Sequence, residues 1–402
     1  MNFKGKKANS VYLDYAAGAP ETAVSRHARK YADRFYGNPS SIHADGRASR
    51  VLLDSARADC AGAFSAHSDE IIFTGSGTES VNMAIFGIFK HIKLSDPQKP
   101  VHIITSVIEH QAVLSACQHL ETVGATVTYV PVGIDGLINP NDVRNALTEN
   151  TVLVSIGYAN SEIGVVQPIR EIAKEIRHFR KNRNSGYPYF HIDAAQASMY
   201  LDIQVDRLGV DLLSCNGTKL GGPRGTGLLY VKRGVEIAPL VYGGGQEKGI
   251  RSGTENVSAV YGFAHALLHA RKHASHEHIR LQHLRDYFFA ELTKVFPDVR
   301  INGSMTERLP NNVNASFKNF DSELLVIELD AKGISVSAGS ACDSAHDKAS
   351  HVISALYGTE EQKWGTVRFS MGYKTKKRDI TRALNALKAI FKKYEQSNVV
   401  LP

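Results

Sequence analysis

Short apolar runs alternate with amphipathic stretches along the first part of the chain. The apolar runs have the length and residue types of buried β-strands. They fall at residues 70–74, 101–106, 126–131, 152–158, 190–193, 211–214 and 227–231. Helical periodicity is found near 23–35, 48–64, 140–147 and 169–181, and another helix is predicted to begin at about Glu79. This order predicts an α/β protein whose mostly parallel sheet is flanked by helices and binds ligands at the carboxyl ends of its strands.

The pattern changes after residue 258. Helical periodicity covers 259–273 and 280–295, strand-like runs follow at 313–317 and 324–329, and a last helix is predicted at 381–394. We therefore predict a large domain at 1–265 and a smaller C-terminal α+β domain at 266–402, with residues 1–20 packing on the small domain.

Composition narrows the possible classes of protein. The chain has 402 residues, of which 43% are hydrophobic, so it can bury a large core. The formal net charge of +7 is spread thinly, which favours a solvated face or an acidic protein partner over a nucleic-acid groove. The cysteines show neither paired nor metal-ligand spacing, and no apolar run reaches about 18 residues. These features predict a cytoplasmic protein without a structural metal, a membrane segment or a direct nucleic-acid partner.

An acid and a lysine follow two of the predicted strands. Asp193 ends the strand at 190–193, and Lys219 follows the strand at 211–214. Taken singly, the lysine is typical of a solvated surface and the aspartate of a helix cap. Together they supply what pyridoxal phosphate requires, which is an amine that bonds to its aldehyde and a carboxylate that keeps its ring nitrogen protonated.

Two further segments could bind anions. A strand, a glycine turn and a helix start follow one another at 71–79, where free amides and the helix dipole face the turn. The same GSGT sequence is also typical of an ordinary turn between a strand and a helix. Arg368 alternates with apolar residues on a predicted strand, which indicates either an edge position or a buried anionic partner. Its planar guanidinium matches a carboxylate.

Cys342 is the candidate nucleophile. It lies in a run of small residues, 337–344, that cannot pack a core and is predicted to form an exposed loop. Cys60, Cys117 and Cys215 are interpreted as ordinary buried cysteines. An exposed thiol becomes a useful nucleophile where its surroundings stabilise the thiolate.

These segments resemble, in the same order, the motifs of the cysteine desulfurases, a family of class-V-aminotransferase-like pyridoxal phosphate enzymes. The matching segments span nearly the whole chain. They are YLDYAAGAP (12–20), YGNPSSIHADGRA (36–48), IIFTGSGTESVN (71–82), EHQAVL (109–114), ANSEIGVVQPI (159–169), HIDAAQ (191–196), NGTKLGGPRGTG (216–227), GGGQEKGIRSGTEN (243–256), SVSAGSACDSA (335–345) and VRFSMG (367–372).

The resemblance implies a fold and a reaction. The fold is that of the aspartate aminotransferases (fold type I), with the cofactor in the large domain and Cys342 on a loop of the small one. The reaction converts L-cysteine to L-alanine and leaves a persulfide on Cys342. The sulfur then passes to an acceptor protein in iron–sulfur cluster assembly or in a thiolation pathway.

The resemblance also implies roles for individual residues. Lys219 is expected to bond to the cofactor and to remove the α-proton, and His110 to stack on the ring and shuttle protons. The other expected cofactor contacts are Gly77, Thr78, Asp193, Gln196, Asn216 and Thr218. Thr254 is expected to reach the cofactor of the neighbouring subunit in a homodimer. The expected substrate contacts are Arg368, Ser161 and Asn38.

The chain departs from the family pattern at several positions. Asn216 and Thr218 replace a serine and a histidine before the lysine, Ser161 replaces an asparagine, and Asp343 adds a negative charge after Cys342. Two alternatives therefore stay open. One is another pyridoxal phosphate enzyme of this fold, such as a lyase acting on selenocysteine or cysteine conjugates, or an aminotransferase, whose activity is independent of Cys342. The other is a non-catalytic paralogue that serves as a binding scaffold and is colourless.

Overall fold

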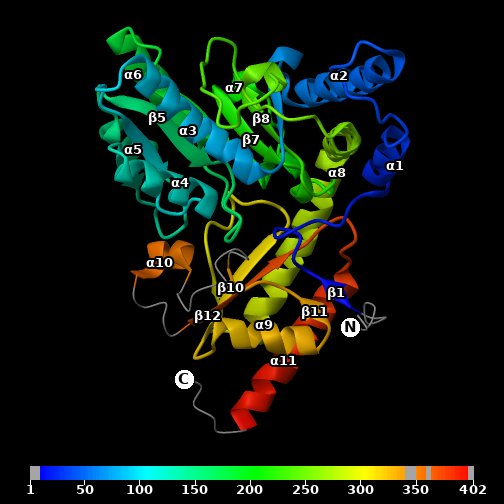
Figure 1. The fold of residues 1–402 in the computed structure, drawn as a ribbon. Coiled ribbons are helices and arrows are strands. Elements are labelled where there is room, and N and C mark those ends of the chain that lie inside the picture. Colours follow the sequence, from blue (N-terminus) through cyan, green and yellow to red (C-terminus); the bar gives the residue numbers. More distant parts are fainter. Residues whose placement is uncertain (1–9, 340–349, 359–363, 397–402) are drawn as a thin grey trace.

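The computed structural model describes residues 10–339, 350–358 and 364–396. Its centre is a seven-stranded sheet with the strand order β2-β8-β7-β6-β5-β3-β4 (Figure 1). In chain order the strands are β2 (Ile71–Thr74), β3 (His102–Ser106), β4 (Thr126–Val130), β5 (Thr151–Gly157), β6 (Tyr189–Asp193), β7 (Leu212–Asn216) and β8 (Gly227–Val231). Within this sheet β8 is antiparallel to both of its neighbours, and the other pairs are parallel. The predicted fold class is confirmed.

Helices cover both faces of this sheet. Before the chain leaves the sheet they are α1 (Ala23–Ala32), α2 (Ala44–Phe64), α3 (Gly77–Ser95), α4 (Gln111–Thr122), α5 (Pro140–Ala146), α6 (Ile169–Arg183) and α7 (Val205–Leu208). Neighbouring side chains on a strand point to opposite faces, so Ile103 packs with α3 and α4 while Ile104 packs with α2 and α6. Most of these strands are buried on both sides and are therefore mainly apolar, which is why short apolar runs identified them.

A second, smaller sheet lies beyond the first. Its strands, in the order β12-β10-β9, are β9 (Arg300–Ile301), β10 (Asn312–Lys318) and β12 (Trp364–Ser370), and they are antiparallel. The helices α9 (Ser322–Ala331) and α11 (Lys377–Gln396) belong with this sheet, whereas the buried residues of α10 (His351–Tyr357) pack against Ile108, Ile163 and Val165. A parallel pair joins β1 (Val11–Tyr12) to β11 (Ile334–Ser335), so the start of the described chain lies beside the small sheet.

One long helix, α8 (Val257–Val295), connects the two sheets (Figure 1). The sequence predicted two helical stretches here, and the structure joins them without a break. Its buried residues pack first among α1 and α2 and later against the small sheet. The proposed domain boundary at residue 265 falls inside this helix and stays a prediction.

The predicted strand at 324–329 is wrong, because these residues form most of α9. Asp321 caps the helix by accepting a hydrogen bond from the Leu324 amide at 2.7 Å. Leu325 and Leu329 are the buried residues of the helix, and their spacing of four places them on one face. The continuous apolar run LLVI concealed this helical spacing.

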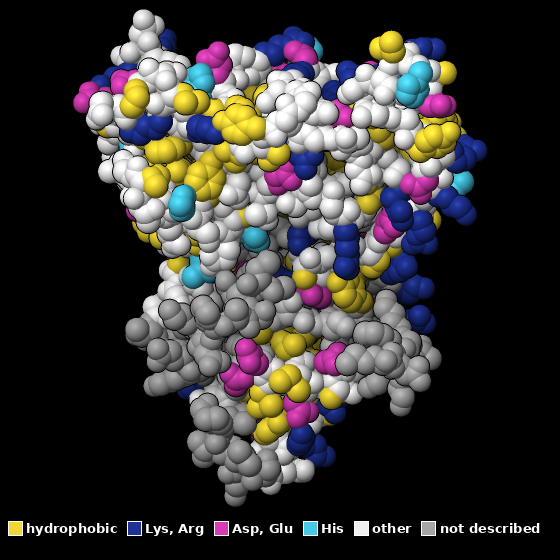
Figure 2. Space-filling model, viewed as in Figure 1, with side chains coloured by type: hydrophobic (Ala, Val, Ile, Leu, Met, Phe, Trp, Pro, Cys, Tyr) yellow, Lys and Arg dark blue, Asp and Glu magenta, His cyan; other side chains and the backbone are white. Residues whose placement is uncertain are grey.

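The surface is mixed in charge. Lys and Arg side chains lie on several parts of the face seen in Figure 2, with a gathering on the side of α1 and α2. No helix in the part of the chain that the structure describes is long and apolar enough to cross a membrane.

Candidate active site

A pocket opens at the carboxyl ends of β3, β5, β6 and β7, where the parallel topology predicts a ligand site. The groups that line it come from segments far apart in the sequence. They include Gly77, Thr78, Glu109, His110, Asn160, Ser161, Glu162, Asp193, Gln196, Asn216, Lys219, His351 and Arg368.

Lys219 lies in a short 3₁₀ turn, η3 (Gly217–Lys219), directly after β7. Asn216 caps this turn: its side-chain oxygen accepts hydrogen bonds from the Thr218 amide at 3.1 Å and the Thr218 hydroxyl at 2.9 Å. The Lys219 ammonium donates to the Ala17 carbonyl oxygen at 2.7 Å. The amine is thus held at the pocket wall and partly buried, where it faces the cavity rather than bulk water.

Asp193 ends β6 and lies in the same pocket. One of its oxygens accepts a hydrogen bond from the Ala195 amide at 2.9 Å. Burial raises the pKa of the Asp193 carboxyl, and the charges of His110 and Lys219 oppose that rise. The amine and the imidazole are therefore close enough to Asp193 to influence the ionisation of its carboxyl.

His110 is the N-cap of α4. Its Nδ1 accepts a hydrogen bond from the Ala112 amide at 3.1 Å, so a neutral His110 carries its proton on Nε2. The ring lines the pocket. This hydrogen bond fixes the tautomer and leaves the Nε2–H available for a ligand in the pocket.

The turn before α3 presents a helix N-terminus to the pocket. Ser76 caps the helix by accepting from the Glu79 amide at 3.1 Å, and Gly77 and Thr78 are the first helical residues. A side chain at Gly77 would come within 3.0 Å of the Asn216 Cβ, so only glycine fits here without a shift. The first amides of a helix lack internal partners and attract anions such as phosphate.

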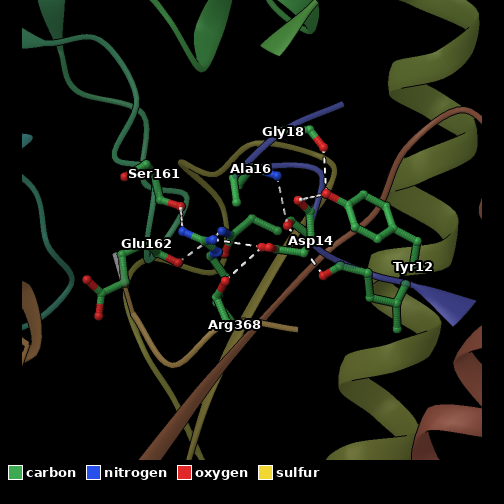
Figure 3. Close-up of polar contacts among 12 residues, drawn as sticks. Tyr12, Asp14, Ala16, Gly18, Ser161, Glu162 and Arg368 are labelled. Carbon is green, nitrogen blue, oxygen red and sulfur yellow. Dashed lines mark hydrogen bonds and ion pairs between the residues drawn. The ribbon is translucent and has the colours of Figure 1, made fainter. Parts of the chain in front are cut away.

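Arg368, on β12 of the small sheet, also lines the pocket. Figure 3 shows it between Asp14 and Ser161. Its side chain is only 2% exposed and forms an ion pair with Asp14, with Nη2 at 2.9 Å from Oδ1. Nη1 donates to the Ser161 carbonyl oxygen at 3.1 Å. The sequence left open an edge position or a buried anionic partner for this arginine. The structure places it on a strand at the edge of the small sheet and gives it an ion pair with the partly buried Asp14.

The other predicted site residues fall into three groups. Gln196 lines the pocket and donates to the Ala16 carbonyl oxygen at 3.0 Å. Thr218, Asn38 and Thr254 are not among the residues that line the pocket: Thr218 bonds to Asn216, which does line it, and Asn38 and Thr254 are exposed. Cys342 lies outside the described residues.

Sequence reasoning missed several pocket residues. Glu109 and His351 line the pocket, and Asp14 forms an ion pair with Arg368 of its wall, but no role was predicted for them. Glu109 and Asp14 stand inside the matched segments, next to His110 and within YLDYAAGAP, so proximity to a motif was the available signal. His351 lies beyond the matched segments; its Nε2 lies 2.9 Å from the Glu109 carbonyl oxygen.

The residues present fit pyridoxal phosphate. The pocket combines an amine, a buried carboxylate, an imidazole with a fixed tautomer and a glycine-containing helix N-terminus. These match the aldehyde, the ring nitrogen, the ring face and the phosphate of that cofactor. Arg368, which lines the same pocket, adds a site for the carboxylate of an amino acid.

Comparison with known proteins identifies the class. The profile of the family described as Aminotransferase class-V matches residues 11–383. The chain therefore belongs to the class-V aminotransferases, which are pyridoxal phosphate-dependent enzymes.

Within that class the chain belongs to the cysteine desulfurases. It is 44% identical to a cysteine desulfurase IscS of Dictyoglomus turgidum over 95% of this chain and 95% of that protein. It is 40% identical to the IscS of Methanosarcina thermophila over 98% of this chain and 95% of that protein.

Two solved structures have the same fold. A NifS-like protein superposes with a TM-score of 0.86 at 30% identity, over 96% of this chain and all of that one. SspA in complex with cysteine superposes with a TM-score of 0.76 at 32% identity, over 90% of this chain and 99% of that one.

Proposed function

We propose that this enzyme converts L-cysteine to L-alanine and carries the released sulfur as a persulfide on Cys342. The observation that supports this most strongly is the convergence of Lys219, Asp193, His110 and Arg368 on one pocket. These are the amine, acid, imidazole and carboxylate ligand that the reaction needs, and they come from four separate segments. A related protein of known structure, SspA, was solved in complex with cysteine, which supports the choice of substrate.

The cofactor would be held from three sides. Gly77, Thr78, Asn216 and Thr218 would contact its phosphate, Asp193 its ring nitrogen and Gln196 its phenolic oxygen. When bound, pyridoxal phosphate withdraws electrons from the α-carbon of the amino acid and so makes the α-proton acidic.

Lys219 and His110 would move the protons. In this proposal the freed amine of Lys219 removes the α-proton, since it lies at the pocket wall within electrostatic reach of Asp193. His110 would donate a proton from its Nε2–H, because its Nδ1 already accepts a hydrogen bond from the Ala112 amide. Arg368 would bind the α-carboxylate and hold the substrate in register with these groups.

Cys342 would accept the sulfur. Its thiolate would form a bond to the substrate sulfur while the bond between that sulfur and the β-carbon breaks. The electron pair of the broken bond stays with the carbon fragment, which takes up protons and leaves as alanine. The described residues on either side of the Cys342 segment support this assignment, because Ser337 bonds to Asp14 and His351 lines the pocket.

Substituting Cys342 tests the assignment. Cys342→Ala is expected to keep the yellow colour of the bound cofactor and to lose alanine production from L-cysteine. Cys117→Ala is the matched control, because Cys117 is buried between α4 and the sheet. Alanine formation at the parental rate by Cys342→Ala would favour a lyase or an aminotransferase instead, and a colourless parent protein would favour a scaffold.

The active unit would be a homodimer with shared sites. Thr254 is exposed in a loop that Arg251 joins to Glu79 of α3, so it lies beside the phosphate-binding turn yet outside the pocket of its own chain. In a mixed dimer of Lys219→Ala and Thr254→Ala chains, sharing of Thr254 between subunits would restore one intact site. If Thr254 acts within its own chain, no intact site would form and activity would not recover.

The setting would be a reducing compartment such as the cytoplasm. The described cysteines, Cys60, Cys117 and Cys215, are all free and buried. The sulfur would pass to an acceptor protein of iron–sulfur cluster assembly or of a thiolation pathway.

A further inference from the structure

Asp14 forms a largely buried ion pair with Arg368, which lines the pocket (Figure 3). The arginine side chain is 2% exposed and the aspartate side chain 17%. Within the described part of the chain, Arg368 Nη2 and the Ser337 hydroxyl both donate to the same oxygen of the aspartate, Oδ1, at 2.9 Å each. Asp14 therefore fixes the guanidinium and also neutralises its charge while no ligand carboxylate is bound.

The guanidinium keeps capacity for a ligand. Of its five N–H groups, Nη2 donates to Asp14 and Nη1 donates to the Ser161 carbonyl oxygen. The buried Nε has no hydrogen-bond partner among the residues that the structure describes. A carboxylate binds an arginine best through two adjacent N–H groups, and Arg368 lines the pocket, so the edge of the guanidinium that these contacts leave open toward the pocket is the natural place for it.

A carboxylate on that edge would meet Asp14 as a competitor. Both anions would be attracted to one cation in a region shielded from water, and the two negative charges would repel each other. The affinity of the pocket for carboxylates would then depend on Asp14 as much as on Arg368.

We propose that Asp14 is a positioning residue that competes with the amino-acid carboxylate for Arg368 and thereby weakens the binding of both substrate and product. This inference rests on the proposed role of Arg368. Its functional value is product release: a lone buried arginine would hold the carboxylate of alanine more tightly than turnover requires.

If Asp14 had only a structural role, removing its charge would not tighten the binding of carboxylates. The main chain of Asp14 is held without the help of its side chain. Its carbonyl oxygen accepts a hydrogen bond from the Tyr12 hydroxyl at 3.0 Å, and its backbone forms a parallel β-bridge with Ser370. Asparagine at this position keeps the main-chain contacts, and its amide oxygen can take the place of Oδ1. Asp14→Asn therefore removes the charge and preserves the scaffold.

The test measures ligand binding to the cofactor-loaded enzyme. Asp14→Asn is expected to bind L-alanine about fivefold more tightly than the parent, because a like charge next to the ligand is gone. Isopropylamine has a methyl group in place of the carboxylate, and its affinity is expected to stay within about twofold. Asp69→Asn, which alters an exposed pair with Arg233, is the matched control and is expected to leave both affinities unchanged.

Two further variants make the result decisive. Asp14→Ala is expected to tighten alanine binding as well, and Arg368→Ala to weaken it at least tenfold by removing the carboxylate ligand. If neither Asp14 variant binds alanine more tightly while Arg368→Ala weakens binding, the inference about Asp14 is overturned and the role of Arg368 stands. If Arg368→Ala leaves the affinity unchanged, both proposals are overturned.

Discussion

Arg251 and Glu79 form an ion pair, with Nε at 2.7 Å from Oε1, that ties the loop carrying Thr254 to the first turn of α3. The other oxygen of Glu79 accepts a hydrogen bond from the Gly75 amide at 2.8 Å. A carboxylate thus lies beside the proposed phosphate site, and the guanidinium of Arg251 balances its charge.

From the Arg251–Glu79 ion pair we predict how substitutions change the affinity for the cofactor. Arg251→Ala is expected to weaken binding of pyridoxal phosphate about tenfold, since the uncompensated Glu79 repels the phosphate. Adding Glu79→Gln to that variant is expected to recover much of the loss. The measurement is a titration of cofactor-free enzyme with pyridoxal phosphate, followed by absorbance. Equal affinities in the single variant and the parent would show that Arg251 does not serve the phosphate site.

Glu109 predicts a loss of stability at alkaline pH. Burial raises the pKa of its carboxyl to about 8; the Gly157 amide, which donates to it, opposes the rise, and Asp193 adds to it. The folded protein then holds a proton that the unfolded chain gives up near its ordinary pKa. The contribution of Glu109 is fully present below that ordinary pKa and is lost as the pH rises toward and through about 8.

A neutral replacement isolates this effect. The difference in thermal midpoint between Glu109→Gln and the parent is expected to grow in favour of the variant between about pH 5 and about pH 9. An exposed carboxylate, Glu149, provides the control through Glu149→Gln. Parallel pH profiles for parent and Glu109→Gln would contradict the buried, protonated state assigned to Glu109.

For His191 we expect the opposite dependence of stability on pH, with a loss of stability in acid. It is fully buried on β6, two residues before Asp193. Its Nδ1 lies 2.8 Å from the Ser155 hydroxyl and its Nε2 2.8 Å from the Ser214 hydroxyl. Burial lowers its pKa to about 3, so the unfolded chain binds the extra proton first as the solution is acidified. The stability from neutral His191 is present above its ordinary pKa and is lost as the pH falls toward about 3.

Removing this ring is expected to be costly. His191→Ala leaves two buried hydroxyls without their partner and opens a cavity, for a loss of about 2–4 kcal/mol in the free energy of unfolding. Urea denaturation at neutral pH measures the loss. His276→Ala is the control, because the exposed His276 ring is expected to contribute within about 0.5 kcal/mol. A similarly small effect at His191 would mean that the strand network tolerates the gap.

Local patterns predicted the sheet because most of its strands are buried on both sides and are therefore mainly apolar. The same criterion failed at 324–329, because these residues form a helix that Asp321 caps. The helical spacing of its buried residues cannot be recognised within a continuous apolar run. The pocket residues on the strand ends could be predicted, since parallel strands bring their carboxyl ends to one edge. The pairing of Asp14 with Arg368 could not, because 354 positions separate them and only the packing of β1 against the small domain joins them.

The central claim is that Lys219 is the amine that bonds to the cofactor. Reduction of the holoenzyme with sodium borohydride makes that bond permanent, and digestion followed by mass spectrometry locates it. The account predicts the pyridoxyl group on the peptide that contains Lys219, and no labelled peptide from the Lys219→Ala variant. Label on a different lysine of the parent enzyme, or equal labelling of the variant, would contradict it.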